Sequence, residues 1–157
     1  MRIGLGYDVH RFADGRRLIL SGVEFPGETG LDGHSDADVV LHAVADAILG
    51  AAAMGDIGDH FPPDDERWRD ADSADLVRQV VEMVAAAYAI VNVDVTVIAE
   101  RPKIKPRRLE MRNRLAELLA ITDGQVSIKA TTNEMLGAIG RSEGIAAIAN
   151  ALLEERE

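Results

Sequence analysis

Residues 2–10 read RIGLGYDVH, and this first apolar run predicts a β-strand. In an extended strand, residues two apart in the sequence point to the same face of the sheet. Asp8 and His10 are therefore expected to lie side by side, where a carboxylate and an imidazole can bind a metal ion. An acid and a base on a wet surface would have the same spacing, so the strand alone leaves both interpretations open.

Beyond this strand, helical and strand patterns alternate along the chain. Residues 16–26 have the pattern of strand material with a glycine-marked break, and we expect them to pair with the first strand as a hairpin. Apolar spacing predicts the other elements, which are helices at 37–54, 73–89, 107–120 and 142–157 and strands at 92–100 and 125–132. Strands interleaved with helices predict a single domain over residues 1–157, of mixed α/β or α+β type, with helices packed on a sheet.

Two polar segments separate these elements. Residues 27–38 are rich in glycine and aspartate and are expected to form a loop. Residues 55–72 have no period, and a structureless segment of this length is usually functional or disordered. Polar residues also predict the helix N-caps, which are Ser35 or Asp36 for the first helix, Asp72 or Ser73 for the second and Ser142 for the terminal one.

The composition excludes several classes of protein. A formal net charge of −10 without a basic run argues against long nucleic acids and anionic membrane surfaces as partners. The absence of cysteine leaves only His, Asp and Glu as metal ligands. No apolar run approaches the roughly 20 residues of a membrane span, and no signal-peptide pattern is present. We therefore expect a cytoplasmic protein.

The four histidines, His10, His34, His42 and His60, all lie in the first half of the chain beside acidic loops. His42 is expected on the first helix, four residues from Asp38 and four from Asp46. A solvated polar stripe explains this spacing as well as a binding site does. If the helix packs on the first strand, Asp8, His10 and His42 form a three-ligand site suited to zinc, with a fourth position open.

Three further motifs each have a functional and a local structural interpretation. His34 and Ser35 precede a helix N-terminus, where phosphates bind, although ordinary capping explains them too. Gly55 and Gly58 flank Asp56 in a potential ligand loop, but Gly55 also fits a helix C-cap. Residues 129–141 read KATTNEMLGAIGR and offer a phosphate-and-cation cradle, with Lys103 and Arg141 as local cations and Glu134 as a ligand for Mg²⁺. The pattern Thr131-x-x-Glu134 equally matches a capping box.

Taken together, these motifs resemble one family. The stretches GYDVHRF, GHSDADVVLHAVADAILGAAAMGDIGDHFPPDD, NVDVTVIAERPKI and KATTNEMLGAIGRSEGIA are similar, in order and over nearly the whole chain, to the 2-C-methyl-D-erythritol 2,4-cyclodiphosphate synthases. The resemblance implies an α+β fold with a mixed sheet facing a threefold axis, helices outside, and a homotrimer with sites between subunits. It also implies a metal-dependent lyase of the non-mevalonate isoprenoid pathway, which cyclises a cytidine-diphosphate substrate and releases CMP.

The resemblance assigns roles to particular residues. It implies zinc on Asp8, His10 and His42, and a second divalent ion, Mg or Mn, near Glu134. His34 and Thr132 match positions that stabilise the transition state. The positions implied in substrate binding are His34, Ser35, Asp56, Ile57 and Gly58 at the methylerythritol and phosphates, Phe61 to Asp65 in a lid, Ala99, Pro102, Lys103, Ile104, Thr131 and Thr132 around the cytidine, and also Asn133 and Arg141.

The chain departs from the family pattern at three positions. Ala138 stands where an aromatic residue is common and Ser142 where glycine is common, and Pro63 replaces an acid of the lid found in some members. We expect Ala138 to weaken an apolar contact near the threefold cavity or the ligand, and with it isoprenoid binding along that axis, but to leave the metal chemistry unaffected. Three other classes of function remain to be distinguished, namely a sensor of isoprenoid diphosphates, a generic zinc hydrolase and a purely structural oligomer.

Overall fold

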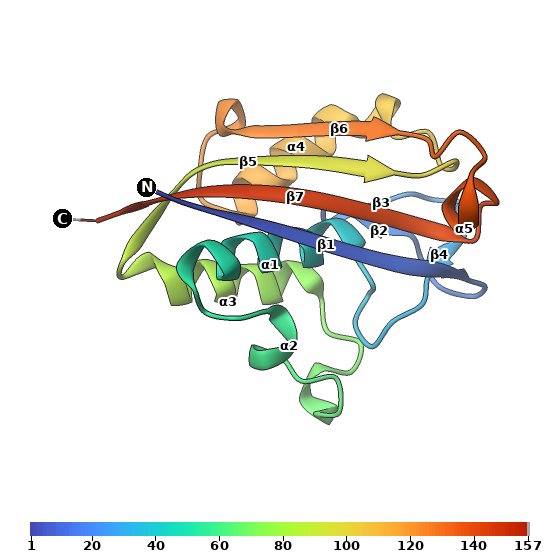
Figure 1. The fold of residues 1–157 in the computed structure, drawn as a ribbon. Coiled ribbons are helices and arrows are strands. Elements are labelled where there is room, and N and C mark those ends of the chain that lie inside the picture. Colours follow the sequence, from blue (N-terminus) through green and yellow to red (C-terminus); the bar gives the residue numbers. More distant parts are fainter. Residues whose placement is uncertain (157) are drawn as a thin grey trace.

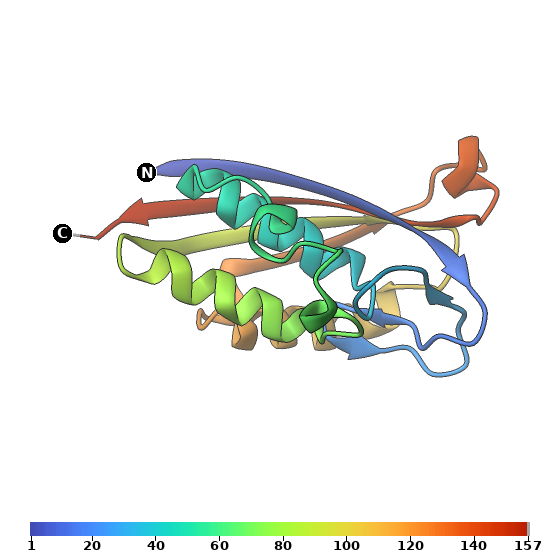
Figure 2. The same cartoon turned by 90° about the horizontal axis from the view of Figure 1, so that it is seen from below.

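The computed structural model describes residues 1–156, which form a five-stranded mixed β-sheet with helices on one face, and a separate pair of short strands (Figures 1 and 2). The sheet order is β4-β1-β7-β5-β6, and the strands are β1 (Arg2–Ala13), β4 (Gly30–Leu31), β5 (Tyr88–Ile98), β6 (Val126–Thr131) and β7 (Gly144–Glu155). Only β5 and β6 are parallel, and the other neighbours are antiparallel. The predicted α+β class is confirmed.

Three helices lie together on one face of the sheet, as Figure 2 shows. They are α1 (Val39–Ala52), α3 (Ser73–Ala85) and α4 (Arg108–Leu118). Buried apolar side chains between these helices and the sheet form one core cluster. The remaining short elements are β2 (Ile19–Leu20), β3 (Val23–Glu24), α2 (Ile57–His60), η1 (Glu66–Trp68), η2 (Lys105–Arg107), η3 (Asp123–Gln125) and α5 (Gly137–Gly140). None of the helices described is long and apolar enough to cross a membrane.

Strand β1 packs directly against α1 because two of its helix-facing residues are glycines. A Cβ atom at Gly4 would lie 2.0 Å from the Ala47 carbonyl oxygen, so no side chain fits there. The same strand face carries Asp8 and His10 beyond the glycines, as the strand alternation predicts. Close packing of β1 on α1 therefore brings these two side chains to the helix.

The predicted terminal helix at 142–157 is wrong, because residues 144–155 form β7 in the middle of the sheet. Its alanines favour a helix intrinsically, but β7 pairs with β1 and β5 on both edges, and this tertiary context overrides the local preference. Small side chains on its buried face leave room for α1. The predicted cap Ser142 consequently lies in the turn before the strand.

Other local predictions also need correction. The first strand forms no hairpin with residues 16–26, because β2 pairs with β3 while β1 pairs with β4 and β7. The cap of α1 is Asp38 rather than Ser35 or Asp36, and its buried carboxylate accepts hydrogen bonds from the backbone of both α1 and the β2–β3 turn. Asp72 caps α3 as predicted.

Neither the helix C-cap considered for Gly55 nor the capping box considered for Thr131 and Glu134 forms. The left-handed C-cap of α1 is Ala53, so Gly55 lies beyond it. Thr131 and Glu134 form no capping box, because Thr131 ends β6 and no helix begins between the two residues. The loop at 55–72 is not structureless, since it contains α2 and η1.

Candidate metal centre

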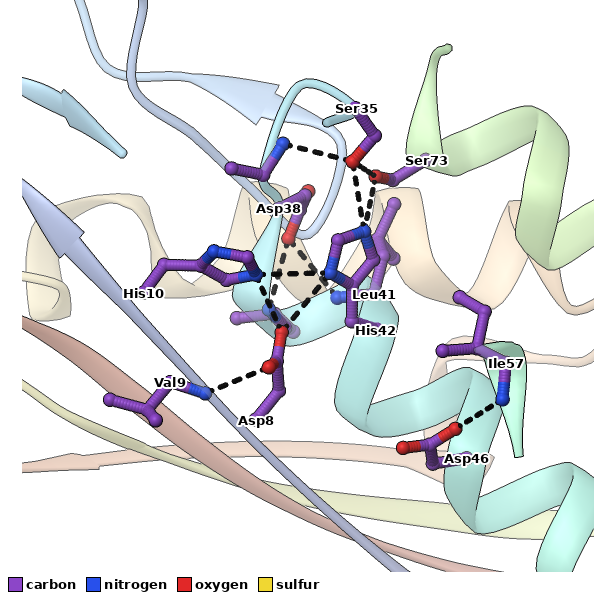
Figure 3. Close-up of polar contacts among 12 residues, drawn as sticks. Asp8, Val9, His10, Ser35, Asp38, Leu41, His42, Asp46, Ile57 and Ser73 are labelled. Atoms are coloured by element: carbon purple, nitrogen blue, oxygen red, sulfur yellow. Dashed lines mark hydrogen bonds and ion pairs between the residues drawn. The ribbon is translucent and has the colours of Figure 1, made fainter. Parts of the chain in front are cut away.

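Three side chains from two elements converge where β1 passes the start of α1 (Figure 3). Asp8 Oδ2 lies 2.9 Å from His10 Nε2 and 3.1 Å from His42 Nδ1. The two imidazole nitrogens lie 3.2 Å apart. Asp8, His10 and His42 are the one group of three potential metal ligands within the part of the chain that the structure describes.

The donor set and its spacing fit a metal ion. Two imidazole nitrogens and one carboxylate oxygen are typical protein ligands of zinc. Ligands at bonds of about 2.0 Å around a tetrahedral zinc lie roughly 3.3 Å apart, close to the separations in this group. The three side chains are partly buried and leave one side open. The polar-stripe interpretation of His42 is therefore wrong for this residue, which faces Asp8 and not solvent.

The electrostatics of the three residues favour an ionised carboxylate. Burial acts to raise the pKa of Asp8, but hydrogen bonds and charges from His10 and His42 outweigh it and hold that pKa well below its usual range. Burial acts to lower the pKa of His10, but Asp8 and the Asp32 carbonyl outweigh it and raise that pKa. Without a metal, Asp8 and His10 thus form an ion pair.

The outward ring nitrogens of both histidines have hydrogen-bond partners. His10 Nδ1 lies 2.5 Å from the Asp32 carbonyl oxygen, so Nδ1 carries a proton and donates it to this carbonyl, and Nε2, which faces Asp8, is the nitrogen that must lose its proton to bind a metal. His42 Nε2 lies 2.9 Å from Ser73 Oγ and 3.1 Å from Ser35 Oγ. The role of Asp32 could not be predicted from the sequence, because a backbone carbonyl carries no residue-type signal.

A cavity of about 250 Å³ opens beside His10 and His42. One end is polar and the rest is lined by apolar side chains of α2, η1 and α3. Phe61 and Trp68 meet there edge to face, with ring centroids 5.0 Å apart. The lining residues are His10, Gly33, His34, Ser35, His42, Ile57, Gly58, Phe61, Pro63, Trp68 and Leu76.

Some predicted lid and loop residues do not line this cavity. Asp56 caps α2, and its carboxylate accepts a hydrogen bond from the Asp59 amide. Asp65 caps η1 and binds Arg67, whose guanidinium lowers the pKa of that carboxyl. Asp46 accepts a hydrogen bond from the Ile57 amide at 2.8 Å, and this bond connects α2 to α1. Trp68 and Leu76 line the cavity but were missed, because each was assigned to a loop or a helix face.

The predicted cytidine residues and Glu134 lie at the end of β6 and in the segments that follow β5 and β6, away from the three metal ligands. Ala99 donates to the Thr131 carbonyl oxygen at 3.0 Å, and the Asn133 amide donates to Glu100 at 2.9 Å. The residues of this second group are Ala99, Pro102, Lys103, Ile104, Thr131, Thr132, Asn133 and Glu134. Arg141 lies in the turn after α5, where its guanidinium binds Glu143.

The pairing register of the strands gives the distance between the metal ligands of β1 and the segment that follows β6. Val9, Ala146, Ile98 and Thr131 occupy one row across four adjacent strands. Three strand spacings of about 4.8 Å put roughly 14 Å between β1 and β6 in this row. The structure therefore does not bring Thr132 and Glu134 of the same chain to Asp8 and His10.

Comparison with known proteins gives one consistent family. The profile of the YgbB family matches residues 1–154. A 2-C-methyl-D-erythritol 2,4-cyclodiphosphate synthase of Symbiobacterium thermophilum is 58% identical, over 99% of this chain and 100% of its own. The solved IspF–CDP complex of Plasmodium falciparum has a TM-score of 0.86 and 36% identity, covering 99% of this chain and 97% of its own. The bifunctional IspDF of Campylobacter jejuni has a TM-score of 0.95 and 39% identity, but this chain covers only 42% of it.

Proposed function

The chain belongs to the YgbB family of 2-C-methyl-D-erythritol 2,4-cyclodiphosphate synthases, and we propose that it catalyses the same cyclisation. The substrate is 4-diphosphocytidyl-2-C-methyl-D-erythritol 2-phosphate, and the product serves the non-mevalonate route to isoprenoids. The observation that carries this proposal is the convergence of Asp8, His10 and His42 beside a cavity whose lining includes the family positions His34, Ser35, Ile57 and Gly58. We expect the enzyme to act in the cytoplasm.

The reaction is an intramolecular phosphoryl transfer. An oxygen of the 2-phosphate forms a bond to the β-phosphorus, and the bond from that phosphorus to the bridging oxygen of the α-phosphate breaks. CMP leaves with the bridging oxygen and its electron pair. Because the attacking phosphate is already an anion, the protein needs no strong base and acts by positioning the groups and neutralising their charge.

The metal set is proposed as zinc on Asp8, His10 and His42, with Mg²⁺ or Mn²⁺ near Glu134. Bound at its three ligands, zinc supplies a Lewis acid for a phosphate oxygen. Asp8 and the two histidines hold this charge in place because their other polar atoms are already hydrogen-bonded. Glu134 presents an exposed carboxylate that accepts a hydrogen bond from Thr132 at 3.1 Å.

The residues around the cavity are proposed to position the rest of the substrate. His34 stands exposed at the cavity edge, where its imidazole can contact a phosphate. Ile57, Phe61 and Leu76 offer an apolar surface for the methyl-bearing carbon chain and exclude water. Thr132 is proposed to contact the diphosphate, while backbone groups around Ala99 and Ile104 hold the cytosine.

We propose a homotrimer in which each site combines two chains. The outward face of β1 exposes a row of four apolar side chains, with Ile3 74% and Leu5 65% exposed, followed by Tyr7 and Val9. Burial of such a face favours association, and charged residues are absent from this row. A neighbour's Thr132 and Glu134 can then approach Asp8 and His10, which those of the same chain do not reach.

Mixing two inactive variants tests the shared site. Asp8→Ala and Glu134→Ala are each expected to abolish turnover. In each mixed trimer, one interface combines an intact metal set from one chain with an intact Glu134 from its neighbour. Random 1:1 mixing of the two variants by refolding should therefore restore about a quarter of wild-type activity. No recovery on mixing would mean that each site lies within one chain.

Product analysis tests the function itself. Purified chain with the cytidine-diphosphate substrate and Mg²⁺ should release CMP and form one cyclic product per CMP. An open-chain diphosphate would instead indicate a zinc hydrolase. Tight binding of substrate or of isoprenoid diphosphates without turnover would indicate a sensor.

A further inference from the structure

A chain of hydrogen bonds runs from His42 away from the metal centre and ends at a carboxylate. His42 Nε2 lies 2.9 Å from Ser73 Oγ, and Ser73 Oγ in turn makes a short hydrogen bond to Asp36 Oδ1 (Figure 3 shows the His42–Ser73 step). The Ser73 amide also donates to Asp36 Oδ2 at 3.2 Å. Asp36 therefore binds both the side chain and the backbone of Ser73.

The direction of each proton in this chain follows from chemistry. His42 Nδ1 faces Asp8 and needs a free lone pair to bind a metal, so the ring proton resides on Nε2. That N–H donates to Ser73 Oγ. An ionised carboxylate only accepts, so the Ser73 hydroxyl donates to Asp36. The protons along this path therefore point from His42 through Ser73 to Asp36.

The middle residue of this hydrogen-bond chain, Ser73, is shielded from solvent. Ser73 is fully buried at the first position of α3, and its hydroxyl has no contact with bulk water. The Asp36 amide donates to the Ala71 carbonyl oxygen at 3.1 Å, which joins the two segments beside the hydrogen-bond chain. Ser35 Oγ is the other neighbour of His42 Nε2, at 3.1 Å, but its hydroxyl reaches no carboxylate among its contacts.

We propose that Ser73 and Asp36 are positioning residues that fix the tautomer and ring orientation of His42 for the metal. The proposal rests on the metal site described above. A carboxylate acting through a hydroxyl makes His42 Nδ1 a better ligand and holds it toward Asp8. Partners of this kind, behind the metal ligands, typically change metal affinity about 10- to 100-fold when removed.

The test measures zinc affinity directly, by competition with a chromogenic chelator, in wild type, Ser73→Ala and Asp36→Asn. Both variants are expected to bind zinc about 10- to 100-fold more weakly. Because the two residues act through one path, the double variant should bind no more weakly than Ser73→Ala alone. The absorption spectrum of the Co²⁺-loaded variants should shift, since the orientation of one nitrogen ligand changes.

Ser21→Ala is the matched control. Ser21 is also a fully buried serine, and its hydroxyl donates to the Met111 carbonyl oxygen at 3.0 Å, outside the metal centre. This variant should lose stability without losing zinc affinity. If Ser73→Ala does not fold, Asp36→Asn carries the test, because it preserves side-chain shape.

Three outcomes overturn the proposal. Zinc affinity within twofold of wild type in both Ser73→Ala and Asp36→Asn would make the hydrogen-bond chain merely structural. Additive losses in the double variant would mean that the two residues act separately. Failure of the wild-type chain to bind zinc at all would remove the metal site together with this proposal, whereas the first two outcomes leave the metal site intact.

Discussion

The carbonyl oxygen of Ala43 occupies the place of a Gly6 side chain, because a Cβ atom there would lie 1.9 Å from it. Real Cβ atoms do not approach an oxygen so closely, and therefore α1 can lie this near β1 only if residue 6 is glycine. The metal centre depends on this contact. Asp8 lies two residues beyond Gly6 on the same strand face, and His42 directly precedes Ala43 on the helix.

Gly6→Ala should displace α1 and separate His42 from Asp8. Overpacking of this kind costs about 1–3 kcal/mol of unfolding free energy. We expect a lower denaturation midpoint and weaker zinc binding, measured by urea unfolding and by chelator competition. The control is Gly50→Ala in α1, where an added Cβ meets nothing within 4 Å. That variant should be more stable by about 0.5–1 kcal/mol, and a similar effect of both substitutions would contradict the packing argument.

The turn before β7 carries a strained residue. Ser142 has a φ of 58°, in the left-handed region that favours glycine. Ser142→Gly should therefore raise the free energy of unfolding by about 0.5–1 kcal/mol. Ser127→Gly in β6 should lower it, because that position is extended. Thermal denaturation of both variants measures the two signs, and destabilisation by Ser142→Gly would show that the serine side chain makes a compensating contact.

Arg16 holds the loop that carries His34. Its guanidinium donates to the Gly33 carbonyl oxygen at 2.8 Å and to that of Ser35, on both sides of His34. Arg16→Met should mobilise His34 and lower kcat by about 10- to 100-fold, while zinc affinity changes little. Arg17→Met is the control, since Arg17 is largely exposed and its guanidinium binds Glu24, an exposed partner outside the loop that carries His34. Equal kcat values for the two variants would exclude this role of Arg16.

Metal binding should weaken as the pH falls, because zinc must displace the proton of His10. The pKa of His10 in the folded chain lies above its usual 6.5, so the weakening should begin above pH 6.5. It should reach about tenfold per pH unit below the folded pKa. Chelator competition between pH 6 and 8 measures this slope, and a flat profile would mean that His10 is neutral without metal.

The stability of the metal-free chain should depend on pH in a different manner. The raised pKa of His10 stabilises the fold below pH 6.5, and this contribution is lost as the pH rises through the folded value. The lowered pKa of Asp8 stabilises it above pH 3.8 and is lost on acidification. Both contributions are fully present only between these two values, and each declines gradually outside them. Urea midpoints measured with chelator should therefore peak in that window, and a maximum above pH 8 would contradict the ion pair.

The sequence predicted the metal ligands better than it predicted the strands. Alternation in β1 is a local property, so Asp8 and His10 were expected on one face and lie there. The helical period likewise predicted α1 and allowed His42 to join them. Strand β7 was missed because its alanines pack between β1 and β5, and this pairing is a property of the whole sheet. The hydrogen bond from His10 to the Asp32 carbonyl was invisible because every residue has a carbonyl.

The relation between the metal centre and the Thr132–Glu134 segment could not be derived from motifs either. Both segments carry polar side chains, and their strand ends lie at the same edge of the sheet. Two intervening strands nevertheless separate β1 from β6. The order of strands, and not residue type, therefore decides that one chain does not complete the proposed site.

We expect cyclisation by this chain to require a metal ion held by Asp8, His10 and His42. The most direct measurement is phosphorus NMR of the purified chain with the cytidine-diphosphate substrate and Mg²⁺, before and after zinc chelation, with His42→Ala alongside. We expect a cyclic diphosphate and CMP from the untreated chain, with both products lost on chelation and in the folded His42→Ala variant. Cyclic diphosphate formed at an unchanged rate by the chelated chain or by His42→Ala would contradict it.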